Sequence, residues 1–442
     1  MTPPRSPDGR FDEQETWPSE RWQRFQRRLL RAQLRHAYRD LPFYRRRLEE
    51  AGLADGTLRG PEDFARMPLL TKADVLDAMR SAKTFAVGIE RLNPGEATVL
   101  GMSSGTLGTA VLVYSRSWRQ ATAKALARAY WWAGLRPGMR IMIAAPAWHS
   151  MALQETWVVE KLGALCVVPW GTFLPRFAGG FLDTLIEQKP SLVTTFLPML
   201  YAIIAECRRR DIDLARAFSA VDTVLVVGAP MTARARQRLR EDLGVRELLE
   251  GAGSAEGLLA MECEAHEAHH YFIDACYVEI VDPSTLRPLP PGRRGSVVVS
   301  SLVPHGSVYL RYDTEDIGEI LAEPCPCGRT WPRLEIYDRR SNQFRVRDRE
   351  LLWYDVRACL DEVPELVGLP FAVIRAAGPS SHLRIAMEGP HQADRGPLAR
   401  RIEALSASRL GVPVRLEWVE GMPVRWKGVT VINERQWSGD RG

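Results

Sequence analysis

The middle of the chain alternates short apolar runs with longer segments whose apolar residues recur every three or four positions. The apolar runs have the length of buried strands and occupy residues 140–146, 164–170, 191–196 and 223–230. The segments between them have the spacing of amphipathic helices and occupy residues 150–163, 176–189 and 197–214. This alternation predicts a doubly wound α/β sheet, whose ligands bind at the carboxyl ends of the strands.

The pattern changes after about residue 260. Two β-rich runs flank a segment rich in proline and glycine, which predicts a smaller antiparallel subdomain over about residues 261–341. From residue 342 onward, a helix, two strands, another helix and a last strand predict a compact α+β domain. The predicted fold is therefore α/β. A large doubly wound N-terminal domain with a β-rich subdomain spans residues 1–341, and a small α+β C-terminal domain spans residues 342–442.

A basic amphipathic helical segment lies near the start of the N-terminal domain, at residues 21–50. Phe25, Leu29, Ala32 and His36 share one stripe at helical spacing, and arginines cover the rest. A nucleic-acid-binding or lipid-binding helix has a similar pattern. The basic patch is local, however, and no recognition motif accompanies it. The segment is interpreted as a solvated helix that covers a larger domain, without a nucleic-acid partner.

Composition agrees with a soluble globular protein. The 442 residues are 45% hydrophobic and 26% charged, with a net charge of +5. No apolar run reaches the roughly 18 residues of a membrane span, and the polar start has no secretory signal. We therefore expect a cytoplasmic protein without a membrane partner, whose seven cysteines remain reduced.

A loop of small hydroxylated residues and glycines lies between two β-prone segments. Its glycines let the backbone approach an anion, and its hydroxyl groups add donors, as a phosphate-binding loop requires. The residues concerned are Ser103, Ser104, Gly105, Thr106, Gly108 and Thr109. No lysine follows the second glycine, so the loop is not the P-loop of NTPases. Taken alone, it is also compatible with an ordinary flexible turn.

Further motifs follow this loop in a fixed order. They read VVGAP, EGAGSAEG, LRYDTED and CPCGR, and a lysine near the end of the chain completes the series. With the early segments HAYRDLPFYRRRLEEAGL and PLLTKADVL, the chain resembles the phenylacetate-CoA ligase family of the adenylate-forming superfamily over about residues 34–435. The resemblance implies an ATP-dependent ligase that converts a small aromatic carboxylic acid to an acyl adenylate, releases pyrophosphate and transfers the acyl group to CoA.

The resemblance also implies roles for individual residues. Ser103 to Thr109 would hold the β- and γ-phosphates of ATP, and Asp316 would bind the ribose hydroxyls. Arg340 would contact the nucleotide near a hinge, about which the small C-terminal domain is mobile. The residues that would flank the adenine or close under the nucleotide are Gly228, Ala229, Pro230, Gly253 and Ser254.

The chemistry requires positive charge where two anions meet. A carboxylate attacks the α-phosphorus of ATP, and charge develops on the phosphoryl oxygens and the leaving pyrophosphate. The resemblance implies that Glu256 holds Mg²⁺ against the phosphates. It assigns Lys427, near the end of the chain, as the mobile catalytic lysine.

Three cysteines and a histidine have the composition of a closed structural zinc site. Cys325 and Cys327 form a C-x-C turn, while Cys263 and His270 lie in one earlier segment. The resemblance places a Cys, His and C-x-C group at these positions. It favours His270 over His269 as the ligand because the following strand aligns in register. Reduced, unpaired cysteines are the alternative interpretation.

Aromatic residues at strand ends are candidates for the acid pocket. The resemblance places the pocket near Trp148, His149, Trp170, Gly171 and Phe196. Aromatic walls favour a flat apolar acid, with a few polar groups that fix its orientation. Core packing is the ordinary alternative for such residues.

The chain departs from the family in ways that bear on nucleotide binding and on the second half-reaction. Thr109 occupies the usual position of a lysine, and Arg349 or Glu350 occupies that of a glycine in the thiol tunnel. Two alternatives therefore stay open. One is acyl transfer to an amine or hydroxyl by an enzyme of specialised metabolism, and the other is a noncatalytic relative that binds nucleotide or acid. A homodimer is possible.

Overall fold

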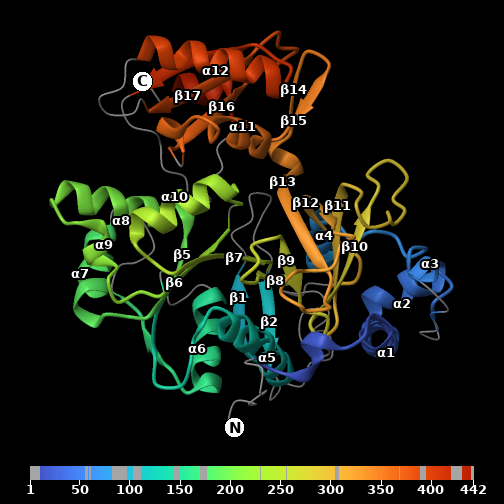
Figure 1. The fold of residues 1–442 in the computed structure, drawn as a ribbon. Coiled ribbons are helices and arrows are strands. Elements are labelled where there is room, and N and C mark those ends of the chain that lie inside the picture. Colours follow the sequence, from blue (N-terminus) through green and yellow to red (C-terminus); the bar gives the residue numbers. More distant parts are fainter. Residues whose placement is uncertain are drawn as a thin grey trace.

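The computed structural model describes most of the chain. The described residues are 10–54, 58, 61–81, 97–102, 111–143, 150–169, 177–228, 230–254, 256–303, 308–367, 369–388, 395–419 and 431–439. Figure 1 shows a broad lower body and a smaller unit, drawn in orange and red, above it.

An eleven-stranded sheet runs through the lower body, in the order β10-β11-β12-β13-β9-β8-β7-β6-β5-β3-β4. Strands β3 to β7 pair in parallel, and every pair from β7 to β10 along the sheet is antiparallel. The strands are β3 (Arg140–Ile143), β4 (Leu165–Val167), β5 (Leu192–Phe196), β6 (Thr223–Val227), β7 (Glu247–Gly253), β8 (Leu259–Glu262), β9 (His269–Tyr271), β10 (Cys276–Val281), β11 (Gly295–Ser301), β12 (Tyr312–Ile320) and β13 (Arg333–Arg339).

Helices cover both faces of the parallel part because its strands are apolar on both sides. On one face, Leu192 and Leu225 pack in a core with α5 (Arg116–Trp132) and α6 (Ser150–Leu162). On the other face, Val193 packs in a second core. The helices that contribute to this second core are α7 (Ala178–Gln188), α8 (Leu197–Arg209), α9 (Leu214–Ala217) and α10 (Ala233–Leu243). The alternation of neighbouring residues between two cores is the expected period of a strand.

The β-rich region is an extension of this sheet. The predicted antiparallel strands are present, and β8 to β13 continue the same hydrogen-bonded ladder from β7. The reason is local: β7 and β8 form an antiparallel pair, so the chain turns back and adds strands to the sheet beyond β7. A separate ribbon, β1 (Ala97–Met102) and β2 (Val111–Ser115), flanks residues 103–110.

Helices at the start of the chain cover the β-rich end. They are η1 (Glu13–Thr16), α1 (Ser19–Asp40), α2 (Pro42–Glu50), α3 (Pro61–Phe64) and α4 (Lys72–Ser81). The expected buried stripe of α1 is wrong. Residues Trp22, Gln26, Leu30, Gln33, Leu34 and Ala37 are buried, whereas Ala32 is exposed and Phe25, Leu29 and His36 are half-buried. Buried glutamines explain the error, since Gln26 donates to carbonyls of β-rich segments and a hydropathy pattern assigns it to solvent.

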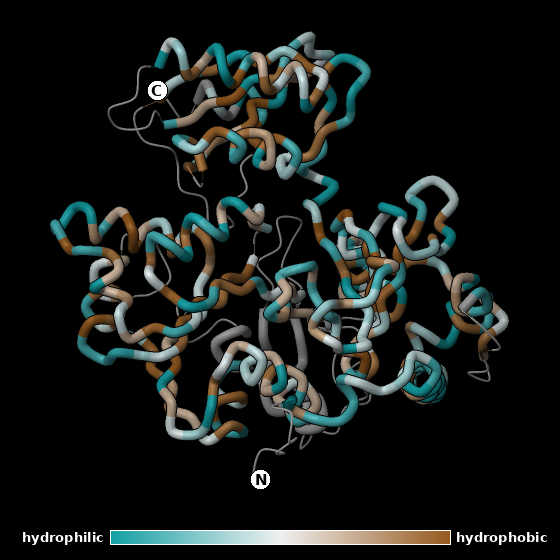
Figure 2. Tube along the Cα trace, viewed as in Figure 1, coloured by the Kyte–Doolittle hydropathy of each residue, from teal (hydrophilic) through white to brown (hydrophobic). Residues whose placement is uncertain are grey.

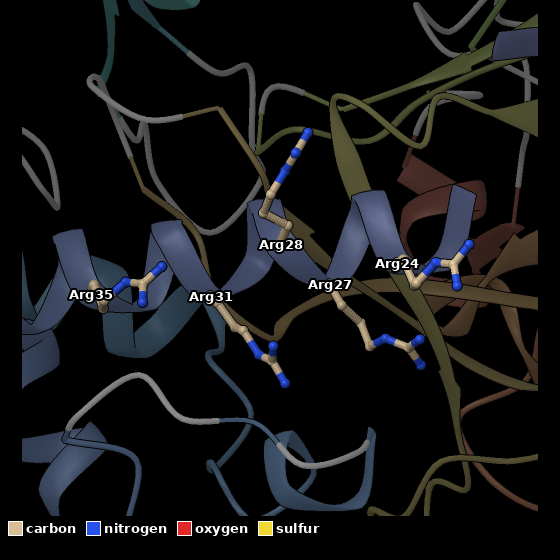
Figure 3. A pocket seen from close by; sticks show the side chains of 5 residues that line it. All are labelled: Arg24, Arg27, Arg28, Arg31 and Arg35. Atoms are coloured by element: carbon tan, nitrogen blue, oxygen red, sulfur yellow. The ribbon is translucent and has the colours of Figure 1, made fainter. Parts of the chain in front are cut away.

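The outer side of α1 carries the arginines. Figure 3 shows the side chains of Arg24, Arg27, Arg28, Arg31 and Arg35 along this helix, where they line a surface hollow of about 540 Å³. The helix lies at the lower right of Figure 1, away from the C-terminal unit. No helix within the described ranges combines the length and apolar character that a membrane crossing needs.

The C-terminal unit has its own four-stranded sheet, in the order β18-β17-β16-β19, and a small hairpin of β14 and β15. Its apolar core is separate from the cores of the lower body, and in Figure 2 apolar segments run through its interior. Its elements are η3 (Arg340–Asn342), β14 (Phe344–Val346), β15 (Arg349–Leu351), α11 (Trp353–Leu360), η4 (Pro364–Leu366), β16 (Phe371–Arg375), β17 (Leu383–Glu388), α12 (Arg395–Arg409), β18 (Val414–Val419), β19 (Val431–Asn433) and α13 (Glu434–Gly439).

Candidate nucleotide and acid site

The carboxyl ends of three neighbouring parallel strands form one edge of the candidate site. Phe196 ends β5 and pairs in register with Val227, which ends β6 and in turn pairs with Gly251 of β7. Gly228 follows β6 with a φ of +88°, and a Cβ atom there would lie 3.0 Å from Cδ1 of Phe196. Only glycine combines this backbone conformation with such a close ring. Gly228 and Phe196, which the sequence assigned to nucleotide and acid, therefore lie side by side.

The turn between β7 and β8 presents Glu256. Ser254 and Leu258 close this turn, because Ser254 N donates to the Leu258 carbonyl and Leu258 N donates to the Ser254 hydroxyl. Glu256 Oε1 accepts from the Tyr312 hydroxyl at 3.3 Å and lies 3.8 Å from Lys72 Nζ. The Glu256 side chain is 13% exposed, so the carboxylate is partly screened from solvent. The Glu256 carboxylate is thus held beside the ammonium group of Lys72, on the turn that follows β7.

Lys72 is a residue that the sequence analysis did not assign to the site. Leu70, two residues earlier, exchanges backbone hydrogen bonds with β12, since Leu70 N donates to the Arg311 carbonyl and Asp313 N donates to the Leu70 carbonyl. This pairing anchors the start of α4 against β12 and brings Lys72 to Glu256. Lys72 belongs to the segment PLLTKADVL, which contributed to the family resemblance but was not assigned a role in the site.

Asp316 and Arg340 come from neighbouring strand segments. Asp316 of β12 pairs in register with Arg339 of β13, and Asp316 Oδ1 lies 3.3 Å from Arg339 Nε. Arg340 Nη2 donates to both carboxylate oxygens of Asp313 at 2.6 Å. Asp316 therefore pairs with Arg339, and Arg340 pairs with Asp313; neither pair was predicted from the sequence. The only sign of Asp313 in the sequence was that the motif RYDTED contains another aspartate besides Asp316.

Several predicted site residues lie outside the described residues. They are Ser103, Ser104, Gly105, Thr106, Gly108, Thr109, Trp148, His149, Trp170, Gly171, Ala229 and Lys427. Pro230 follows Ala229 on the chain and precedes α10, whose first turn is capped by the Thr232 side chain. The described part of the site comprises the ends of β5 to β7, the Glu256 turn and the β12–β13 pair.

Cys263, His270, Cys325 and Cys327 come together in one cluster. One donor atom from each residue lies within 4.8 Å of the others. Cys263 Sγ and Cys325 Sγ are 3.6 Å apart, and Cys327 Sγ lies 3.4 Å from His270 Nε2. A tetrahedral zinc ion with zinc–sulfur bonds of about 2.3 Å separates its sulfur ligands by about 3.8 Å. The donor set and its spacing therefore fit zinc.

The surroundings of the cluster orient its ligands. His270 Nδ1 lies 2.9 Å from the Trp331 carbonyl, an arrangement that leaves Nε2 to face the cysteines. Arg329 N donates to Cys327 Sγ at 3.4 Å, and its guanidinium binds Glu15 and Glu264. His269 lies next to the cluster on the chain but contacts the Leu334 carbonyl. The geometry therefore favours His270 as the fourth ligand.

The C-terminal unit contacts the lower body close to this edge of the sheet. Thr232 Oγ1 donates to Asp361 Oδ2 at 2.5 Å, and Arg234 Nη1 donates to the Asp361 carbonyl. Asp361 is also bound by Arg357 at 2.6 Å. At the junction, Asn342 Nδ2 donates to Asp338 Oδ1 at 2.6 Å. These contacts define the orientation of the unit in this structure.

Comparison with known proteins gives one family match and several relatives. Residues 60–304 match the model of the AMP-binding enzyme family. The phenylacetate-coenzyme A ligase of Thermus thermophilus is 28% identical over 386 residues, which cover 85% of this chain and 83% of the relative.

Among solved structures, 2-hydroxyisobutyryl-CoA ligase in its postadenylation state matches with a TM-score of 0.89 at 21% identity, covering 99% of this chain and 95% of the ligase. The same ligase in its thioesterification state, with its adenylate and CoA, matches with a TM-score of 0.71 at 22% identity and the same coverage. The predicted α/β fold is confirmed by the first of these matches.

Proposed function

Because this chain belongs to the family of AMP-binding enzymes, we propose that it activates a small aromatic carboxylic acid with ATP and transfers the acyl group to CoA. The observation that carries this proposal is the position of Glu256. Its carboxylate lies beside Lys72 and Tyr312, on the turn that follows β7, the strand that pairs with β6. A carboxylate and a cation at this edge suit a metal-bound triphosphate.

The chemistry would proceed at the α-phosphorus of ATP. The acid carboxylate attacks this atom, the bond to the β-phosphate oxygen breaks, and pyrophosphate leaves. Glu256 would hold Mg²⁺, which neutralises phosphate charge when it is bound. Lys72 is placed to approach the same phosphates, and Asp316 would accept hydrogen bonds from the ribose hydroxyls. Lys427 would bring a further positive charge with the C-terminal unit.

Pyrophosphate release with a panel of aryl acids tests the adenylation step. We expect acid-dependent release by the wild-type protein and almost none by Lys427→Ala or Glu256→Ala, with unchanged far-UV circular dichroism. Lys161→Ala, on the last turn of α6, is the matched control. Wild-type release rates in Lys427→Ala would contradict the assignment of this lysine. If no acid supported release, the proposed enzyme would be ruled out in favour of a noncatalytic relative.

The acceptor is tested by product analysis with and without CoA. An amine or hydroxyl acceptor is the second candidate, because Arg349 or Glu350, both on β15, occupies the position where the family resemblance implies a glycine. Both side chains are exposed, and Glu350 accepts from Gln343. CoA thioester as the main product supports the first candidate. AMP formation without CoA, with ester or amide products, supports the second and would suit specialised metabolism.

The cysteine cluster supports a structural zinc ion as a further part of the proposal. Its four donors come from β9 and two connecting segments, so a bound ion would join parts of the chain that are 55 residues apart or more. Elemental analysis of protein purified without chelators should give about one zinc per chain. The cytoplasmic location and the possible homodimer stay predictions.

A further inference from the structure

A buried polar group lies between the sheet and the two helices on its α5–α6 face. Tyr130 of α5 donates from its hydroxyl to Glu155 Oε1 of α6 at 2.5 Å. The Tyr130 hydroxyl also lies 3.0 Å from Thr194 Oγ1 of β5. The three residues are 2%, 3% and 0% exposed, respectively, within an otherwise apolar core. Three polar side chains at such a depth are costly unless each is hydrogen-bonded.

The hydroxyl and carboxyl protons of these three side chains can be assigned to individual atoms. Tyrosine has a single hydroxyl proton, and Tyr130 donates it to Glu155. Thr194 must therefore donate to the Tyr130 oxygen. Burial raises the pKa of Glu155 to about 8, so the carboxyl is protonated at neutral pH. Because Oε1 accepts from Tyr130, the carboxyl proton belongs on Oε2.

Glu155 Oε2 is the last atom in the series of hydrogen bonds that runs from Thr194 through Tyr130 to Glu155. This atom is fully buried and has no hydrogen-bond partner within the described part of the structure. A buried donor without an acceptor costs about 1–3 kcal/mol. A ligand with a lone pair at this position would complete the network.

The position of Thr194 relates this group to the proposed acid site. Successive strand residues alternate between faces, so Thr194 lies on the same face of β5 as Leu192 and Phe196, which pack with the α5–α6 core. Val193, between them, packs with the opposite core. Thr194 is two residues before Phe196 and therefore about 6.6 Å further from the strand end. Phe196 is the ring that contacts Gly228 at the predicted nucleotide edge.

We propose that Tyr130, Glu155 and Thr194 form the polar floor of the acid subsite and select an aromatic acid with an oxygen substituent, a hydroxyl or an ether, remote from its carboxylate. This inference rests on the proposed function. The acid carboxylate would face the nucleotide near Gly228, the ring would pass Phe196, and the remote oxygen would accept from Glu155. An acid without that oxygen leaves the buried donor unpaired, and sites built to bind such a group reject the analogue lacking it.

Paired acids test the selection directly. Pyrophosphate release is measured with ring-hydroxylated and ring-methoxylated aryl acids and with the unsubstituted parent of each. We expect the wild-type kcat/KM to favour an oxygen-bearing acid over its parent by about 10²-fold or more. Glu155→Leu should remove this preference by lowering kcat/KM for the substituted acid to about that of the parent. Tyr130→Phe, which frees Glu155 from its fixed orientation, should reduce the preference as well.

Two controls separate selection from structural support. Glu155→Gln keeps an acceptor for Tyr130 and places an N–H donor at the position of Oε2, so it should retain the preference. Thr195→Val alters the neighbouring buried threonine on the opposite face of β5, and it should leave the preference unchanged while Thr194→Val reduces it.

Two results would overturn the inference. One is a wild-type protein that uses parent and substituted acids equally well. The other is a set of floor variants that slow all acids by the same factor, which would indicate a purely structural network. Either result leaves acid-dependent pyrophosphate release intact, and with it the proposed function. Absence of release with every acid would instead refute the proposed function, and this inference with it.

Discussion

Replacement of Glu155 by glutamine should change the pH dependence of stability in a calculable way. Burial raises the pKa of Glu155 from its ordinary value of 4.5 to about 8. The folded protein therefore retains a proton that the unfolded chain releases above pH 4.5. Stability from this group is fully present below pH 4.5 and is lost as the pH rises towards about 8. Glutamine has no such proton and should lack this dependence.

The magnitude follows from the pKa difference. A difference of about 3.5 units corresponds to about 5 kcal/mol over the whole range, or about 1.4 kcal/mol per pH unit within it. Among the described residues, the ionisable groups placed against Glu155 are Tyr130 and Cys166, and neither titrates in this window. Burial, followed by the neighbouring Glu155 carboxyl, raises the pKa of Tyr130 well above its ordinary value, and burial raises the pKa of Cys166 to about 11. Thr194 carries no ionisable group.

Urea unfolding at pH 5, 6, 7 and 8 measures this effect. The free energy of unfolding of Glu155→Gln minus that of wild type should increase with each step, by about 1.4 kcal/mol per unit. The difference between two proteins cancels the contribution of all other titrating groups that the substitution leaves alone. Parallel stability profiles would refute the argument, because they would mean that Glu155 is ionised in the folded state and that Oε2 carries no proton.

Three further predictions concern other parts of the molecule. Cys327→Ser should reduce zinc content to well below one ion per chain and lower the melting temperature; normal zinc content would contradict the assigned ligand set. Lys72→Met should lower kcat/KM for ATP by about 10²-fold with little change in the melting temperature, and an unchanged value would remove Lys72 from the site. Arg236→Met should lower the free energy of unfolding by about 3–5 kcal/mol, because it leaves the buried carboxyl groups of Glu250 and Glu262 without their shared cation. A loss below about 1 kcal/mol in urea unfolding would contradict that last estimate.

The sequence was sufficient for the parallel part of the sheet. Strands β3, β5 and β6 and helices α6 and α8 lie where the apolar periodicity predicted them, because burial on both faces makes each strand a continuous apolar run. The rotation of α1 was not predictable in this way. Its buried face includes Gln26 and Gln33, whose amides donate to the carbonyls of Cys276 and Val303 some 250 and 270 residues away. Hydropathy does not register such long-range hydrogen bonds.

Candidate site residues that belong to a short sequence motif could be predicted. Those that reach the site only through pairing between distant segments could not. Glu256 and the cysteine ligands were named from short motifs. Lys72 reaches Glu256 only because Leu70 pairs with β12, which lies some 240 residues later. Similarly, Tyr130, Glu155 and Thr194 occupy three different elements, and the sequence alone would assign Glu155 to a solvent-facing position. They form one polar group only through the hydrogen bonds between them.

The orientation of the C-terminal unit bears on how one site would serve two half-reactions. In the arrangement seen here, Asp361 accepts from Thr232 at the interface and Asn342 donates to Asp338 at the junction. A net contribution of about 1 kcal/mol for each such bond is small enough for a rotation to break and re-form them. Any rotation of the C-terminal unit about residues 338–342 would have to break both hydrogen bonds, and Thr232→Val with Asn342→Ala would remove them without changing the core of either part.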